Sequence, residues 1–150
     1  MFLCISINRS PLIRLNPVPV PVLRGVVLIR ILIGDDRAMT RDALKAMFAL
    51  RPHWLVCGEA QDFPEVLAKA LDLRPDVIIV DFKMPPYNGI ESVRKMSRAL
   101  PSIPIIMYTL YKTEELEAAA KSAGVRSVVG KEDGVQYLLA AIEAELAISR

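Results

Sequence analysis

The feature that most constrains the fold is the run Val77-Ile78-Ile79-Val80, which is apolar at every position. A strand with one face in water alternates apolar and polar residues, whereas an uninterrupted apolar run needs cover on both faces. Such cover is typical of the central strand of a parallel sheet, where helices pack on each side. The run therefore predicts an α/β domain.

Strand-like and helix-like patterns alternate on either side of this run. Further strands are expected at residues 29–33, 54–58, 103–108 and 127–129. Apolar residues at helical spacing indicate a helix before Pro52, one beginning at Asp62, one over residues 90–100, one capped by Thr113, and one over residues 135–146. Five strands alternating with five helices predict a doubly wound, flavodoxin-like parallel sheet with strand order 2-1-3-4-5.

Local signals at two helix ends support this assignment. Asp62 can cap the second helix, and Glu65 is spaced to complete a capping box. Gly124 follows Ala123 at the end of the fourth helix, where a C′ glycine is expected.

The first 27 residues differ from the rest of the chain. Pro17, Pro19 and Pro21 exclude a helix there and remove donors that a strand would need. We therefore expect an extended or disordered segment over residues 1–27 and one folded domain over residues 28–150.

Charge and composition exclude several classes of function. The first 30 residues carry four arginines and no acid, while the other 120 carry 15 basic and 17 acidic residues. A mildly acidic body does not indicate direct nucleic-acid binding by this chain. No apolar run reaches the roughly 18 residues that would indicate a membrane span. Cys4 and Cys57 lack metal-ligand spacing and fit a reducing compartment, so a cytoplasmic protein is expected.

Polar residues gather where the expected strands end. Asp35 and Asp36 follow the first strand, Asp81 the third, Thr109 the fourth and Lys131 the fifth. In open α/β sheets, ligands bind beyond the carboxyl ends of the strands. A single aspartate there is more often a helix cap or a solvated loop residue, but five such positions on four strands indicate a functional site.

Three adjacent carboxylates need a cation. Two like charges 4 Å apart repel by about 4 kcal/mol at an effective dielectric constant near 20. Oxygen ligands without a nearby His or Cys favour Mg²⁺ over Zn²⁺. Since Mg²⁺ uses one or two carboxylates, Asp81 remains available as a nucleophile for a phosphoryl group. Lys131 and Thr109 could then contact the transferred group.

The chain resembles the receiver domains of two-component response regulators, which have a CheY-like fold. The resemblance runs from about residue 30 to residue 146 and rests on motifs in family-like order. The Lys131-Glu132-Asp133 sequence is similar to that of the NarL/FixJ-like group, whose members usually continue into a DNA-binding output domain. The motifs are Ile33-Gly34-Asp35-Asp36, Val80-Asp81-Phe82-Lys83-Met84-Pro85, Asn88-Gly89, Ile106-Met107-Tyr108-Thr109 and Ala123-Gly124.

This resemblance implies a role for each site residue. Asp81 would be the phosphoacceptor, Asp36 would bind Mg²⁺ directly, and Asp35 would bind it largely through water. The backbone carbonyl of Lys83 would be a further metal ligand, and Thr109 and Lys131 would contact the phosphoryl group. The chain would be a signalling phosphoacceptor rather than an enzyme, with only self-catalysed phosphotransfer and autodephosphorylation.

The resemblance also implies partners. A histidine kinase or a small phosphodonor would supply the phosphoryl group. An output domain or partner protein would contact the face formed by the fourth helix, fifth strand and fifth helix, and a homodimer is a further option.

Four positions are candidates for altered tuning. Val128 stands where the family often has Tyr or Phe, and it cannot reproduce the inward swing of an aromatic ring. Leu110 follows Thr109, where the family usually has a small residue. Tyr111 is a candidate shield of the phosphoryl group, and Lys83 is a candidate for tuning its hydrolysis.

Other functions remain open at this stage. Val128 and Leu110 favour a receiver-like protein-binding module that works without phosphorylation. A nucleotide- or flavin-binding protein would share the fold but lacks the glycine-rich phosphate loop. A haloacid-dehalogenase-like phosphatase would need an aspartate where this chain has Lys83.

Overall fold

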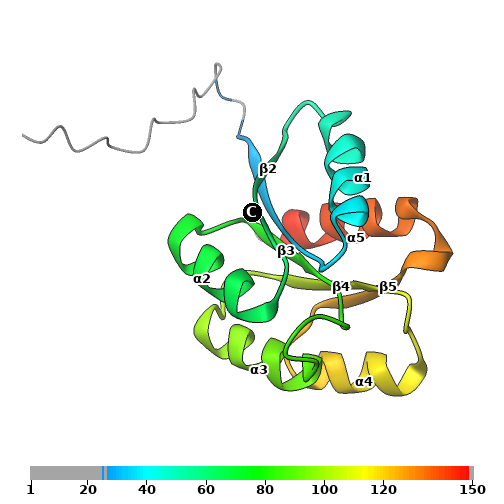
Figure 1. Cartoon of the computed structure of the whole chain (residues 1–150). Coiled ribbons are helices and arrows are strands. Elements are labelled where there is room, and N and C mark those ends of the chain that lie inside the picture. Colours follow the sequence, from blue (N-terminus) through cyan, green and yellow to red (C-terminus); the bar gives the residue numbers. More distant parts are fainter. Residues whose placement is uncertain (1–24, 26, 149–150) are drawn as a thin grey trace, which may run out of the picture.

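The computed structural model describes residue 25 and residues 27–148, so most of the segment expected at residues 1–27 lies outside the described residues. Strands and helices alternate along the described chain (Figure 1). The elements are β1 (Ile29–Gly34), α1 (Ala38–Ala49), β2 (Trp54–Ala60), α2 (Phe63–Leu73), β3 (Val77–Val80), α3 (Gly89–Ala99), β4 (Ile105–Thr109), α4 (Glu114–Ser122), β5 (Ser127–Gly130), a short 3₁₀ turn (Lys131–Asp133) and α5 (Val135–Ile148).

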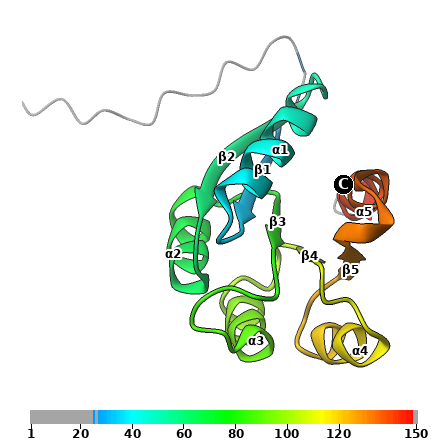
Figure 2. The same ribbon diagram turned by 45° about the vertical axis from the view of Figure 1, so that its right-hand side comes forward.

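The five strands form one parallel sheet with the order β2-β1-β3-β4-β5. Helices α1 and α5 cover one face of the sheet, and α2, α3 and α4 cover the other (Figure 2). This arrangement confirms the flavodoxin-like, doubly wound fold expected from the sequence.

The central strand β3 contributes to both layers of the core. Val77 and Ile79 pack towards α1 and α5, while Ile78 and Val80 pack towards α2, α3 and α4. All four side chains are almost fully buried. Burying an aliphatic side chain of this size contributes about 1.5–3 kcal/mol, so β3 needs an apolar residue at every position.

Strand β2 contains a bulge that extends it beyond the expected end. Ile31 of β1 pairs with Val56, but Leu32 pairs with Gly58, so Cys57 is the extra residue. The Cys57 Sγ donates a hydrogen bond to the Ile31 carbonyl oxygen at 3.4 Å. After the bulge, pairing continues to Ala60, two residues past the predicted end at residue 58.

Two further boundaries test the local predictions. Strand β4 begins at Ile105 rather than at residue 103, because Pro104 has no N–H to donate, although its carbonyl accepts from the Ile78 N–H at 3.0 Å. Asp62 caps α2 as predicted by accepting from the Glu65 N–H at 2.8 Å. In a capping box the Glu65 carboxylate would accept from the Asp62 N–H. That part of the prediction is wrong, because the carboxylate accepts from the Gln61 N–H instead.

The end of α4 agrees with its predicted glycine cap. Gly124 has a φ of +108°, and the next residue, Val125, donates its N–H to the Ala120 carbonyl at 3.0 Å. This is the bond pattern of a helix closed by a left-handed residue.

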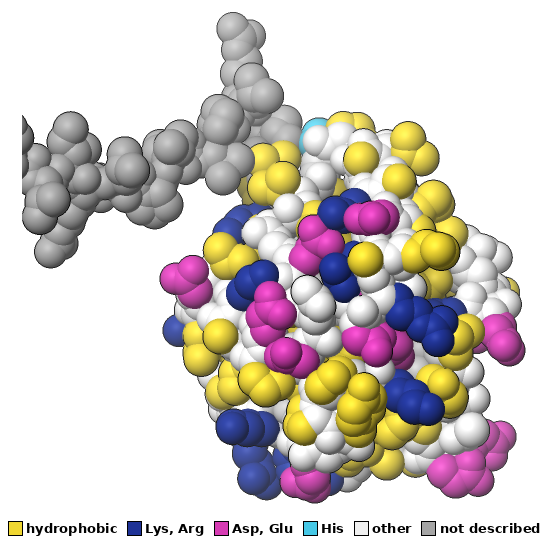
Figure 3. All heavy atoms as spheres, viewed as in Figure 1, with side chains coloured by type: hydrophobic (Ala, Val, Ile, Leu, Met, Phe, Trp, Pro, Cys, Tyr) yellow, Lys and Arg dark blue, Asp and Glu magenta, His cyan; other side chains and the backbone are white. Residues whose placement is uncertain are grey.

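On the face shown in Figure 3, acidic and basic side chains are interspersed among apolar ones. Among the described helices, none is long and apolar enough to cross a membrane.

Candidate functional site

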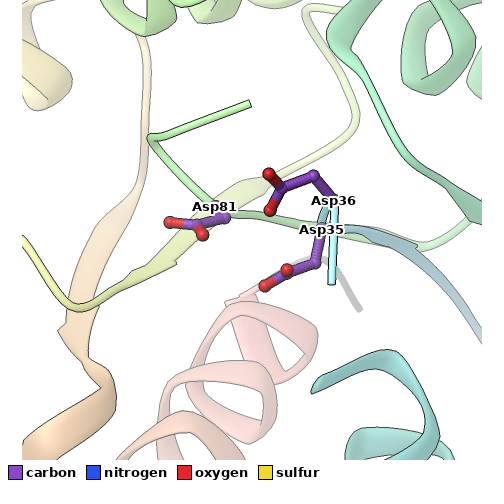
Figure 4. Close-up of side chains that lie close together, drawn as sticks. All are labelled: Asp35, Asp36 and Asp81. Atoms are coloured by element: carbon purple, nitrogen blue, oxygen red, sulfur yellow. The ribbon is translucent and has the colours of Figure 1, made fainter. Parts of the chain in front are cut away.

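Strands β1 and β3 bring three carboxylates together at one edge of the sheet. Gly34, the last residue of β1, pairs with Val80, the last residue of β3. Asp35, Asp36 and Asp81 therefore leave the sheet side by side, and each offers an oxygen within 4.8 Å of the others (Figure 4). A glycine is required before Asp35, because a Cβ at Gly34 would lie only 2.5 Å from the Cγ2 of Val66.

Lys131, immediately after β5, lies against two of these acids. Its Nζ is 2.6 Å from Asp35 Oδ2 and 3.2 Å from Asp81 Oδ2. None of these three side chains is more than 11% exposed. Burial alone would lower the pKa of Lys131, but the hydrogen bond to Asp35 and the charge of Asp81 outweigh burial and raise this pKa above its ordinary value. The ammonium therefore stays charged and pairs with two of the three carboxylates.

The two adjacent acids of the β1–α1 loop differ in their contacts. Asp35 is held at four polar atoms: its N–H donates to Ala60, its carbonyl accepts from Arg41, and its two carboxylate oxygens accept from the Arg37 N–H and from Lys131. Asp36 is exposed, and its carboxylate makes no hydrogen bond or ion pair with any described residue. Asp36 is thus the acid with free oxygens for a cation.

Thr109 is the last residue of β4 and is fully buried. Its Oγ1 accepts a hydrogen bond from the Tyr111 N–H at 3.2 Å. The structure shows no hydrogen bond between this hydroxyl and Asp81, although Asp81 follows β3 and Thr109 ends the neighbouring strand β4.

A shallow cavity of about 190 Å³ opens beside Asp36 and Asp81, lined also by Leu110 and Tyr111. The Lys83 Nζ lies 4.7 Å from the centre of the Tyr111 ring, so the two side chains form a cation–π contact at the rim. The Lys83 backbone N–H lies 3.4 Å from Asp81 Oδ1.

Val128 lies away from this cavity. It is buried in β5, within the core cluster on the side of α2, α3 and α4. No aromatic ring therefore occupies this position in the described core.

Sequence reasoning did not identify Arg41 and Glu59. The Arg41 guanidinium donates to the Asp35 carbonyl at 2.7 Å and pairs with Glu59 at 3.0 Å. The only sequence signal is a basic residue six positions after Asp35. Its acidic partner lies 18 positions further along, in strand β2.

A comparison with protein families now identifies the domain. The family described as "response regulator receiver domain" matches residues 31–143. The chain belongs to this family. The membership confirms the resemblance noted in the sequence motifs: the chain contains a receiver domain of the kind found in two-component response regulators.

Two curated proteins illustrate the relationship. The receiver domain is 32% identical over 123 residues to the response regulator GacA of Pseudomonas viridiflava, covering 82% of this chain and 58% of GacA. It is 30% identical over 115 residues to the transcriptional regulatory protein LnrK of Bacillus subtilis, covering 77% of this chain and 52% of LnrK. The chain thus spans about half the length of these curated relatives.

Among solved structures, a LuxR-family two-component response regulator from Aurantimonas sp. SI85-9A1 is 28% identical to this receiver domain. Its TM-score is 0.76, and the match covers 80% of this chain and 86% of that one.

Proposed function

We propose that this receiver domain accepts a phosphoryl group on Asp81 by Mg²⁺-dependent transfer from a histidine kinase. The observation that carries the proposal is the buried Asp81 carboxylate, which lies beside one ammonium group and two further acids. In the transfer, an Asp81 oxygen would form a bond to phosphorus while the bond from phosphorus to the donor histidine breaks. The donor imidazole would leave with that electron pair.

The residues at the site fit Mg²⁺. Three carboxylates within 4.8 Å of one another are paired with a single ammonium, which leaves an excess of negative charge. The side-chain atoms that could bind a metal ion there are all oxygens. Asp36 and Asp81 would bind the ion directly, Asp35 largely through water, and Lys83 through its backbone carbonyl. The bound ion would neutralise charge on the phosphoryl oxygens.

The other side chains have defined tasks in this proposal. The Lys131 ammonium would hold the Asp81 carboxylate in position before transfer and contact a phosphoryl oxygen after it. Thr109 accepts from the Tyr111 N–H, so its own hydroxyl proton remains available for a phosphoryl oxygen. Tyr111 and Lys83 would limit the access of water through the adjacent cavity.

Phosphorylation would alter the face formed by α4, β5 and α5, and an output domain or partner protein would bind there. Self-association into a homodimer through this face is a second use of it. The described cysteine Cys57 is a free thiol, in keeping with a cytoplasmic location. We propose no direct nucleic-acid contact and no membrane contact for this chain.

Val128 favours one alternative function. Val128 is buried and cannot reproduce the inward swing of an aromatic ring, so a response to phosphorylation through this position is not expected. The domain would then bind partners without phosphorylation. The two functions differ in whether Asp81 is modified at all.

Incubation with acetyl phosphate and Mg²⁺, followed by intact-mass measurement, tests the proposal. The wild-type chain should gain one phosphoryl group, Asp81→Asn should gain none, and Asp72→Asn, which changes an exposed acid on α2, should behave like the wild type. Label retained by Asp81→Asn would refute the assignment. A folded, Mg²⁺-binding wild type without label would favour the phosphorylation-independent module.

A further inference from the structure

The side chain of Arg41 connects the loop that carries Asp35 and Asp36 to strand β2. Its Nη1 donates to the Asp35 carbonyl oxygen at 2.7 Å, and its Nε lies 3.0 Å from Glu59 Oε1. Only 12% of the Arg41 side chain is exposed. One guanidinium on α1 thus joins the end of β1 to β2.

Glu59 is a well-fixed anchor for this guanidinium. Its second carboxylate oxygen pairs with Lys45 at 2.8 Å, and its backbone carbonyl accepts from Lys69. The hydrogen bond from Lys45, aided by that from Arg41, lowers the pKa of Glu59 below its ordinary value against the opposing effect of burial. Glu59 therefore remains ionised at neutral pH and holds Arg41 in one orientation.

The contact with Asp35 bears directly on Asp36. The carbonyl of Asp35 and the N–Cα bond of Asp36 belong to one planar peptide unit. The Asp36 carboxylate makes no hydrogen bond or ion pair with a described residue, so its position beside Asp81 depends on the orientation of that peptide plane together with the Asp36 side-chain torsions. Arg41 fixes the plane.

We propose that Arg41 is a positioning residue that sets the cation affinity of the acidic site through the Asp35 carbonyl. The inference rests on the proposed Mg²⁺ function. Arginine suits the task because its rigid, planar fork donates to two acceptors at once, which the single ammonium of a lysine does less well. Outer contacts of this kind commonly change metal affinity by 10–100-fold.

The direction of the effect separates positioning from simple electrostatics. Removing a positive charge near an acidic cluster should strengthen cation binding by Coulomb's law. Loss of positioning should weaken it instead. Lys45 provides a matched control, because it is a cation on the same helix that pairs with the same Glu59 but does not contact Asp35.

The experiment is a calorimetric Mg²⁺ titration of the full chain and its variants, with urea unfolding in EDTA to measure stability separately. Arg41→Met should raise the Kd for Mg²⁺ about tenfold. Lys45→Met should leave the Kd nearly unchanged or slightly lower, because Arg41 keeps its own bonds to Glu59 and to the Asp35 carbonyl in that variant. Arg41→Lys, which keeps the charge, should raise the Kd about threefold, and it serves as the test if Arg41→Met does not fold.

Three outcomes are decisive. Wild-type protein that binds no Mg²⁺ would refute the proposed function itself, whatever Arg41 does. If the wild type binds but Arg41→Met and Arg41→Lys bind equally well or more tightly, only the role of Arg41 is overturned. Equal weakening by Lys45→Met and Arg41→Met would also overturn it, because the Asp35 contact would then be irrelevant.

Discussion

The loops that follow β1 and β4 reach the same edge of the sheet but are held very differently. Asp35, in the first loop, is bonded to β2, to α1, to its own loop and to Lys131. In the second loop, Leu110 and Tyr111 are 43% and 44% exposed, and the contacts of Tyr111 are a bond to Thr109 and the Lys83 side chain. We infer that the first loop holds the proposed cation site in place, while the second would be free to adjust on phosphorylation of Asp81.

The largest effect should come from Lys131→Met, which removes the ion pair with Asp35 in the loop after β1. Removing one partner of a buried ion pair leaves uncompensated carboxylates, so the free energy of unfolding in EDTA should fall by about 3 kcal/mol. Phosphorylation by acetyl phosphate should slow by about 100-fold, as for the loss of one donor to a developing negative charge. Urea unfolding and intact-mass time courses measure the two effects.

Lys83→Met is the control for this change, because Lys83 is also a cation beside Asp81 but contacts an exposed ring. Its stability should stay within about 0.5 kcal/mol of the wild type. If both variants were equally stable, the contrast between the two loops would lose its energetic basis.

A smaller effect is expected for Thr109→Val on the β4 side. The variant keeps the shape of the side chain but loses a hydroxyl proton for the phosphoryl group, and a hydrogen bond to a charged group is worth about 1.5 kcal/mol. Phosphorylation should therefore slow about tenfold. The Kd for Mg²⁺ should not change, since the Thr109 hydroxyl bonds to the Tyr111 N–H and makes no hydrogen bond with Asp35, Asp36 or Asp81. A Kd raised as much as in Arg41→Met would show that the two loops act as one unit.

The smallest effect should come from Tyr111→Ala. Loss of the ring removes its cation–π contact with Lys83, worth about 0.5–1 kcal/mol at an exposed site, and opens the cavity beside Asp81. The half-life of the phosphorylated protein should shorten about threefold. Tyr87→Ala is the matched control, because Tyr87 lines the same cavity, whereas the hydrogen bond and the cation–π contact of the Lys83 ammonium are with Tyr111. Equal shortening in both variants would argue against a specific role for the Lys83–Tyr111 pair.

The sequence predicted the fold well because its strongest signals are local. The all-apolar run Val77–Val80, the Asp62 cap and Gly124 each depend on a few neighbouring residues, and all three agree with the structure. The end of β2 and the bonding of Glu65 were predicted incorrectly. The end of β2 depends on how β1 and β2 pair, which a single local pattern does not contain. The Glu65 carboxylate accepts from Gln61 rather than from its neighbour Asp62, a choice between two adjacent N–H groups that residue spacing does not decide.

The site was predictable to the extent that topology determines it. Asp35 and Asp81 meet because parallel strands end at one edge, and this follows once β1 and β3 are assigned as neighbours. The direction of the Thr109 hydroxyl and the contact of Arg41 with Asp35 depend on side-chain packing across several elements. The chemical roles of these residues stay predictions until the variants are measured.

The extra residue in β2 makes the length of that strand a determinant of charge placement. Val56 packs towards α1 and α5, while Cys57 and the next position, Gly58, both face α2, so Glu59 turns towards Arg41 and Ala60 enters the opposite core. Shortening β2 by one residue would exchange the surroundings of Glu59 and Ala60. A carboxylate would then enter an apolar interior, and Arg41 would face a methyl group, with every amino acid of the site itself left intact.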